Sequence, residues 1–261
     1  MTSRRPAEPT VRRAVPADAA RVAAIVRAGM PEPVVPRTIY GARGFVQFLR
    51  DCFAVDAGHF AARYFVAVRG RRAIGFAETR RNAAEVFLNN IYVDPSQRGG
   101  GVGRRLLSAA LAADADAETF ALDVFSTNEG ARAWYVVLGL SALHSYDWRA
   151  VQPPPAGDGF WTVSGLPQAD VVHARYGFSQ VAVATWQGVH ALGRIGDRVL
   201  RAEASMLQDD DAVAALAALG DGREIYTIVD STKSGLPLLS TAFARSERMQ
   251  GRFGDVVARL R

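Results

Sequence analysis

The chain of 261 residues has only one cysteine, Cys52, and only one lysine, Lys233. One cysteine excludes an internal disulfide and a structural zinc site built from several thiolates. Long apolar runs are also missing, and none reaches the roughly 18 residues that a membrane span needs. The first residues, MTSRRPAEPT, lack the apolar segment of a secretory signal. We therefore expect a soluble protein of the cytoplasm with no membrane partner.

The formal net charge is +5, and all but one of the 31 basic residues are arginine. A basic surplus can indicate a nucleic-acid partner. Here the arginines are scattered among acidic residues, so we expect no nucleic acid, with a local exception at Arg98, Arg104 and Arg105. Metal-ligand spacing is absent from the four histidines, and no metal site is expected: His59, His144, His173 and His190.

Apolar periodicity predicts alternating strands and helices in the first part of the chain. Helices are expected from Asp18, over 45–55, from Val102 and over 129–138, where Gly139 ends the last one in a left-handed cap. The expected strands are 10–14, 64–68, 72–79, 85–93, 119–125 and 141–151. This order is typical of an α/β fold with a mixed central sheet flanked by helices.

The segment PPPAGDG at residues 153–159 is the best candidate for a domain boundary, because it is rich in residues that interrupt helices and strands. We expect a catalytic domain over 1–151 and a smaller α/β domain over 160–261. In the second part the patterns predict helices and strands as far as residue 229. They assign no helix or strand to the tail from residue 236. The predicted elements are helices at 169–175 and 209–219 and strands at 179–186, 189–194, 199–205 and 224–229.

The most informative stretch is YVDPSQRGGGVGRRLL at residues 92–107, where a strand ends, a glycine-rich turn follows and a helix begins. Glycines let backbone N–H groups point into one concavity. The new helix adds its own unpaired N–H groups and the positive end of its dipole. Such a turn binds an anion, most naturally a phosphate or pyrophosphate, and Arg98 and Arg104 would add positive charge.

Three phosphate-binding patterns can be compared with this turn. A P-loop needs a lysine after the glycines, and none follows. A dinucleotide loop, G-x-G-x-x-G, is matched at Gly99 and Gly101 but lacks its third glycine, and its acidic residue would be Asp123. The pattern [QR]-x-x-G-x-[GA] is met in full by Arg98, Gly101 and Gly103.

With this third pattern the chain resembles the GNAT superfamily of acetyl-CoA-dependent N-acetyltransferases. The strand that ends in IYVDP at residues 91–95 is similar to the strand before the pyrophosphate loop of that family. Further along, NEGARAWYVVLGL at residues 128–140 matches the family segment N-x-x-A-x-x-x-Y-x-x-x-G-[FL]. The two motifs stand on consecutive strand–helix units, and the resemblance covers about residues 11–151.

The resemblance implies transfer of an acetyl group from acetyl-CoA to a primary amine, by direct attack on the thioester in a ternary complex. It places the extended pantetheine arm along Ile91, Tyr92 and Val93. Asn128 would either hydrogen-bond the pantetheine or cap its own helix. The residues implied to bind the pyrophosphate are Arg98, Gly99, Gly100, Gly101, Val102, Gly103 and Arg104.

An alkylammonium has a pKa near ~10.4, so a base or a water relay must help the acceptor amine to lose its proton. Glu85 begins the strand that leads to the site and, if that strand is regular, shares the acceptor face with Phe87 and Asn89. Glu78 on the neighbouring strand is the alternative base, and Asn89 could hold a water instead. Tyr135 has the position of the family's general acid for the departing thiolate, although it could also bind CoA without proton transfer or pack in the core.

The C-terminal part repeats some features of the first. VDSTKSG at 229–235 shares four of seven positions with VFSTNEG at 124–130, which indicates either a degenerate GNAT-like unit, as in tandem family members, or a chance match. In place of the glycine loop stands QDDD at 208–211, whose acids suit a helix N-terminus but would repel a pyrophosphate. We expect one acetyl-CoA per chain and a second unit that completes the sheet and walls the acceptor pocket.

Two other functions fit part of the sequence. One is a non-catalytic acyl-CoA-binding regulatory module, against which Asn128 and Tyr135 argue, and the other is a nicotinamide-nucleotide enzyme that would use Asp123. The acceptor pocket would be built from loops such as residues 31–44, whose sequence names no ligand. Small-molecule and protein amines both remain open as acceptors, and the chain fits either a monomer or a homodimer.

Overall fold

The computed structural model describes residues 8–55, 62–112, 114–155, 157–233 and 238–261. The expected strands and helices of the first half are present, most of them within two residues of their predicted ends. Gly139 has a φ of 92° after the fourth helix, as the cap prediction requires. The elements are β1 (Thr10–Arg13), α1 (Ala19–Gly29), α2 (Phe45–Ala54), β2 (Ala62–Arg69), β3 (Arg72–Asn82), β4 (Glu85–Val93), α3 (Val102–Leu111), β5 (Thr119–Phe125), α4 (Glu129–Val137) and β6 (Ser141–Val151).

The second half also follows the predicted order, with two additions. Strand β7 has only three residues, too few to show an alternation of apolar and polar side chains. The end of the chain, for which no element was predicted, forms a long strand and a helix. The elements are β7 (Thr162–Ser164), α5 (Leu166–Tyr176), β8 (Phe178–Ala184), β9 (Val189–Ile195), β10 (Val199–Ala202), α6 (Asp210–Leu219), β11 (Glu224–Asp230), β12 (Leu239–Arg252) and α7 (Phe253–Leu260).

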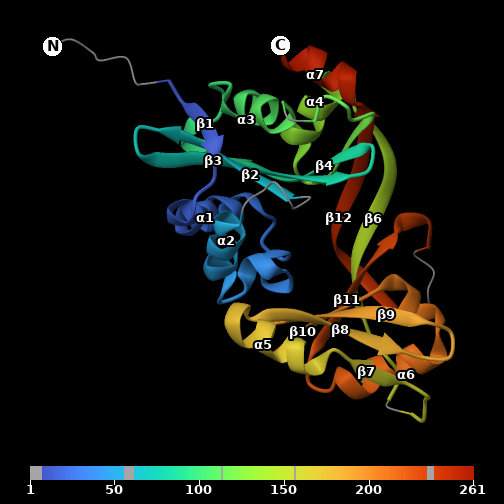
Figure 1. The fold of residues 1–261 in the computed structure, drawn as a ribbon. Helices are drawn as coiled ribbons and strands as arrows, with labels where there is room; N and C mark the ends of the chain where they lie inside the picture. Colours follow the sequence, from blue (N-terminus) through green and yellow to red (C-terminus); the bar gives the residue numbers. More distant parts are fainter. Residues whose placement is uncertain (1–7, 56–61, 113, 156, 234–237) are drawn as a thin grey trace.

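Within the described residues all strands join one twelve-stranded sheet in the order β1-β2-β3-β4-β5-β12-β6-β11-β10-β9-β8-β7 (Figure 1). The pairs β4–β5 and β10–β11 are parallel and the others are antiparallel, so the predicted mixed sheet flanked by helices is confirmed. The two halves lie at opposite ends of this sheet, and β6 and β12 run between them (Figure 1).

Strand β12 comes from the end of the chain but lies between β5 and β6 of the first half. Ser246 stands opposite both Phe125 and Tyr146, and β6 then pairs with β11. The two predicted domains therefore share one continuous sheet. The boundary at residues 153–159 remains a prediction about folding units, since residues 239–252, which follow it in the chain, pair with β5 and β6, which both precede it.

Helix α7 completes the core of the first half. Phe253, Val256 and Leu260 are buried against Leu107 of α3 and Phe120 of β5. On the other face of the sheet, α1 and α2 cover β2 and β3, and a separate apolar core lies under α5 and α6 in the second half. The last residues of the chain therefore stabilise the part of the fold that carries the glycine turn.

The halves also meet between α2 and α5. The N–H of Gly44 donates to the carbonyl oxygen of Tyr176 at 3.0 Å, and Asp51 accepts from Tyr176 Oη at 2.8 Å and from Arg175 Nη2 at 2.7 Å. A Cβ on Gly44 would lie 2.5 Å from the Tyr176 Cα, so only glycine permits this approach. These contacts bring the α1–α2 segment against the second half.

Phe253→Ala should lower the free energy of unfolding by about 3–5 kcal/mol, because its ring is buried in the first-half core. Urea denaturation measures the loss. Phe160→Ala is the matched control: its ring is 67% exposed, and the change should be about 0.5 kcal/mol or less. Equal stability of the two variants would contradict the placement of α7.

Candidate active site

A cavity of about 860 Å³ lies between the α1–α2 segment and the sheet. Its lining comes from α1, from residues 38–49, from strands β3, β4 and β5, and from β12, β6 and the second-half strands β9, β10 and β11. The lining strands follow one another in the sheet, so the cavity extends along the sheet from the first half into the second.

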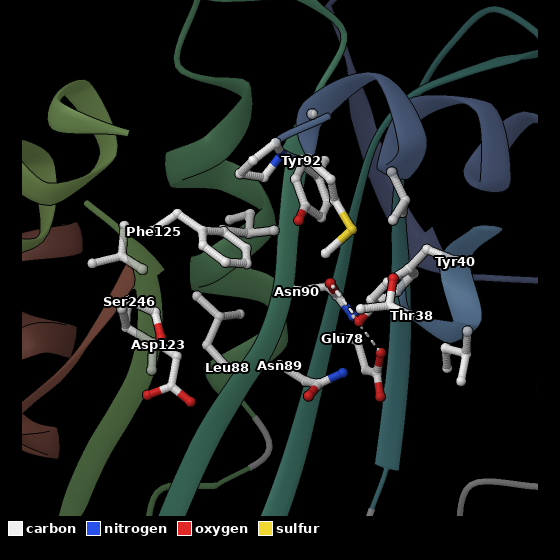
Figure 2. A pocket seen from close by; sticks show the side chains of 18 of the residues that line it. Thr38, Tyr40, Glu78, Leu88, Asn89, Asn90, Tyr92, Asp123, Phe125 and Ser246 are labelled. Atoms are coloured by element: carbon white, nitrogen blue, oxygen red, sulfur yellow. Dashed lines mark hydrogen bonds between the residues drawn. The ribbon is translucent and has the colours of Figure 1, made fainter. Parts of the chain in front are cut away.

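Strands β4 and β5 separate where the cavity begins. Their parallel pairing runs from Glu85–Thr119 to Leu88–Leu122 and stops there. At the same point β4 bulges, since Glu78 of β3 faces Asn90 but the next residue faces Leu88. The condition of a regular strand is therefore not met at Asn89, which is the extra residue of the bulge. Beyond it, the facing edges of β4 and β5 do not pair, and Figure 2 shows Leu88, Asn89 and Asp123 around the opening.

The side chains of Ile91, Tyr92 and Val93 are used in packing. Ile91 and Val93 pack against the core under α3, while Tyr92 points to α1, where a Cβ on Gly29 would lie 2.2 Å from its ring. Burial raises the pKa of the Tyr92 phenol. Beyond Leu88 no backbone pairing joins this edge of β4 to β5, so the edge can pair with an extended ligand.

The glycine turn leads from β4 into α3 with an open end. Gly99 and Gly101 have φ values of 78° and 74°, which favour glycine. No side chain caps α3, so the first N–H groups of this helix, at residues 102–104, have no partner within it. A Cβ on Gly101 would meet no atom within 4 Å, and Arg98 Nε donates to the Val93 carbonyl oxygen at 3.2 Å. The turn thus fits a pyrophosphate.

Helix α6 of the second half has the opposite arrangement. Asp209 Oδ1 accepts from the N–H groups of Asp211 and Ala212 at 3.1 and 3.2 Å, and Oδ2 accepts from Thr185 at 2.6 Å and lies 2.9 Å from His190 Nε2. Burial raises the pKa of the Asp209 carboxyl, but the hydrogen bonds from Thr185 and His190 outweigh it and lower the pKa overall. A carboxylate therefore occupies the place where an anion would bind.

Two residues of the second motif line the cavity near the β4–β5 opening. Asn128 Oδ1 accepts from the Ala131 N–H at 3.3 Å, so the capping role is observed. Tyr135 is buried beside Trp134, with 5.2 Å between the ring centroids, and burial raises the pKa of its phenol. The side chain of Tyr135 therefore packs in the core and also lines the cavity.

Glu78 lies on the other side of the opening in a network of hydrogen bonds. Its Oε2 accepts from Asn90 Nδ2 at 2.8 Å (Figure 2). Its Oε1 accepts from Arg80 at 2.9 and 3.0 Å. Asn90 also donates to the Tyr40 hydroxyl at 3.1 Å. Burial, reinforced by the negative charge of Glu78, raises the pKa of Tyr40 to about 12. Asn90 and Tyr40 were not predicted as site residues, because the bulge in β4 sets the position of Asn90 beside Glu78 and Tyr40.

Glu85 is placed differently from its predicted role. It lies outside the cavity lining, and its carboxylate accepts from Gln250 Nε2 at 3.0 Å. Seven of the predicted site residues line the cavity: Glu78, Asn89, Ile91, Tyr92, Arg98, Asn128 and Tyr135. Val93 and residues 99–104 are not part of the lining.

Residues 36–140 match the family model described as the Acetyltransferase (GNAT) family. These residues form a GNAT domain. For these residues the predicted resemblance is confirmed, and it supports acetyl transfer in general. Asp123, which a nicotinamide enzyme would need, is instead paired with Arg248 at the edge of the cavity.

Solved structures resemble this chain over nearly its whole length. A GCN5-related N-acetyltransferase from Sphaerobacter thermophilus has a TM-score of 0.61 and 18% identity, covering 94% of this chain and 96% of that one. A tandem GNAT protein from the clavulanic acid biosynthesis pathway has a TM-score of 0.62 and 11% identity, covering 95% and 99%. At these identities the likeness shows the fold alone. No curated protein matches the chain in sequence.

The described residues were also searched for membrane-spanning helices and for metal-binding groups. No helix in the described ranges is both long and apolar enough to cross a membrane. In the same ranges, no group of three or more His, Cys, Asp or Glu side chains could hold a metal ion, and His59 lies outside them.

Calorimetric titration of the full chain with acetyl-CoA should give one site, because α3 has an open N-terminus and α6 does not. Gly101→Asp should weaken binding roughly 100-fold, since its carboxylate would cap α3 as Asp209 caps α6 and repel the pyrophosphate. Gly101→Asn has a similar size and tolerates positive φ, so it should weaken binding by about tenfold or less. Two sites, or equal losses in both variants, would contradict this account.

Proposed function

We propose that the GNAT domain is an N-acetyltransferase that moves an acetyl group from acetyl-CoA to a primary amine by direct attack in a ternary complex. The observation that carries the proposal is the cavity itself. One continuous space is lined by the open edges of β4 and β5, by Tyr135 and by the carboxylate of Glu78. Groups that could bind the thioester and a group that could accept a proton from the amine therefore line the same cavity.

The glycine turn and the first turn of α3 would hold the pyrophosphate, and Arg98 adds positive charge there. The free edge of β4 at residues 91–93 would pair with the two amides of the pantetheine arm. Bound in this way, acetyl-CoA supplies a thioester carbonyl that an amine can attack. The two binding elements adjoin in sequence and in space, so together they fix the position of the thioester beside the β4–β5 opening.

Glu78 receives the proton that the amine loses. Its Oε2 accepts one hydrogen bond, from Asn90, and a carboxylate oxygen can accept a second, here from the amine or from a bridging water. The ammonium first loses one proton to water, and the N–H proton of the neutral amine then becomes easier to transfer to Glu78 as the nitrogen bonds to the carbonyl carbon. Arg80 and Asn90 hold the carboxylate in place, so it needs no rearrangement during this transfer.

Tyr135 stabilises the departing sulfur by donating a hydrogen bond to it. A phenol with a pKa near ~10 is a weaker acid than a thiol near ~8.5, so full proton transfer is uphill by about 2 kcal/mol. Burial raises the pKa of Tyr135 and keeps the phenol protonated. The C–S bond thus breaks as the N–C bond forms, and the sulfur leaves as a hydrogen-bonded thiolate.

Release of CoA from acetyl-CoA, measured across a broad panel of small-molecule and peptide amines, tests the proposed function. Acceleration by at least one amine, with acetylated product identified by mass spectrometry, would support it. If acetyl-CoA binds and no amine accelerates its breakdown, the chain is a non-catalytic acyl-CoA-binding module instead.

Glu78→Gln should lower kcat/KM for the best amine by roughly 10²–10⁴-fold, because the variant keeps the shape of the side chain and loses the proton acceptor. Glu85→Gln is the matched control. Its carboxylate lies outside the cavity, so the same substitution there should change kcat/KM by less than about threefold. The reverse result would return the role of base to Glu85.

Tyr135→Phe should lower kcat by roughly 10²–10⁴-fold while the Kd for acetyl-CoA changes by less than about threefold. The ring keeps its packing beside Trp134, and only the hydrogen bond to sulfur is lost. Stopped-flow or steady-state assays give kcat, and calorimetry gives Kd. An unchanged kcat would remove Tyr135 from the mechanism.

A further inference from the structure

The part of the cavity wall that the second half contributes carries a positive charge without a partner. Arg201 lies on β10 and lines the cavity. Among the described residues its guanidinium makes no hydrogen bond and no ion pair. Nothing in the proposed acetyl transfer uses this side chain, because the thioester and the base lie at the β4–β5 opening.

The strand register places the side chains of Arg201 and Tyr226 on the same face of the sheet. Arg201 stands opposite Tyr226 on β11 and opposite Gly193 on β9. A Cβ on Gly193 would lie only 3.3 Å from the Arg201 Cβ, so the glycine leaves room for the arginine. Burial raises the pKa of Tyr226 to about 12, and the positive charges of Arg201 and Arg37 oppose this rise.

The positive charges around Tyr226 are only partly compensated. Arg37 is paired with Glu224 and lies over the ring of Phe243. Arg201 has no such carboxylate. In the described residues, this end of the cavity therefore has one positive charge in excess.

The other charged groups of the lining are balanced. Glu78 is paired with Arg80, and Asp123 with Arg248. Arg98 stands beside the glycine turn, where the pyrophosphate of the co-substrate brings its own negative charge. The excess at Arg201 is therefore available to the acceptor rather than to acetyl-CoA.

Between the two ends the wall is aromatic. Trp148 stacks on Tyr226 with 6.1 Å between centroids and 6° between planes, and Phe125 lies 5.4 Å from Trp148. The indole N–H of Trp148 donates to Ser246 Oγ at 3.1 Å, so its polar group is already satisfied. This stretch of wall suits an apolar segment of a ligand rather than a further polar group.

We propose that the acceptor is an amine that carries a carboxylate, and that Arg201 binds this carboxylate. The inference rests on the proposed function and names its substrate class. A guanidinium matches a carboxylate in a two-point contact. A carboxylate also balances the single excess charge, whereas a phosphate would bring about −1.5 to −2.

The separation of the two ends defines the acceptor further. Glu78 lies on β3 and Arg201 on β10, the outer two of the neighbouring strands β3, β4, β5, β12, β6, β11 and β10. The reacting nitrogen and the carboxylate therefore stand at opposite ends of the acceptor, joined by an apolar chain that lies along Trp148 and Tyr226. An ω-amino carboxylate has this form, whereas an α-amino acid does not.

The test compares kcat/KM for ω-amino carboxylates of increasing chain length with that for their primary amides, which match them in size and lack the charge. Wild-type protein should favour the acid over the amide by roughly 10–100-fold at the best length, mainly through KM. Arg201→Gln should abolish this preference and leave turnover of the amide unchanged. Arg198→Gln removes an exposed arginine that is not part of the lining and should keep the preference. Arg201→Lys should restore part of it.

Equal use of acid and amide by the wild-type protein, or an equal loss on both in Arg201→Gln, would overturn the inference and leave amine acetylation intact. Preference for the matching ω-amino phosphonate would overturn the choice of a carboxylate. If no amine is acetylated, the proposed function fails. Calorimetric titration of the acids into the acetyl-CoA-loaded protein then decides the inference: binding lost in Arg201→Gln supports it, and absence of binding overturns it.

Discussion

The insertion of β12 between β5 and β6 is the constraint on which the rest of the structure depends. Backbone pairing on both edges of β12 makes one sheet of two halves, and α7, which follows it, fills the core beneath α3 and α4. The same strand supplies Ser246 and Arg248 to the cavity. The first half therefore obtains both its core and one wall of its site from the end of the chain. The second half is held in place by the same ladder of hydrogen bonds.

The two halves differ most at a single helix end. In α3 the chain places glycines before the first turn, and the backbone N–H groups stay open for an external anion. In α6 it places Asp209 there, and the same kind of N–H groups are satisfied by an internal carboxylate that is also bound to Thr185 and His190. Since a helix N-terminus stabilises one negative group within its first turn, each helix can accept either its own acid or a ligand. This difference stabilises α6 and leaves α3 to bind the co-substrate.

Local patterns predicted most of the fold, because strand alternation, the glycine turn and the cap at Gly139 are set by neighbouring residues. The tail was uncertain because β12 is half-covered on both faces; only Ser246 and Met249 are buried in it, so no alternation appears. The position of Glu85 outside the cavity lining could not be predicted for a related reason. One extra residue at Asn89 separates Glu85 from the cavity face, and a bulge has no signature in this sequence. Tyr226 and Arg201 were missed because long-range strand pairing, not local sequence, brings them to the site.

The distribution of charge in the cavity follows from the cost of burial. An ionised group removed from water must be compensated by a partner. Glu78, at 6% exposure, accordingly has Arg80 and Asn90, and Asp123 has Arg248. Arg201 is exposed, so water can hydrate its charge, and it has no ion-pair partner in the part of the chain that the structure describes. An acceptor that enters the cavity displaces this water, and the uncompensated guanidinium then disfavours a neutral ligand and favours an anionic one. The unsatisfied charge therefore contributes selectivity by penalising the wrong acceptor, and it does so at a distance from the bonds that form and break.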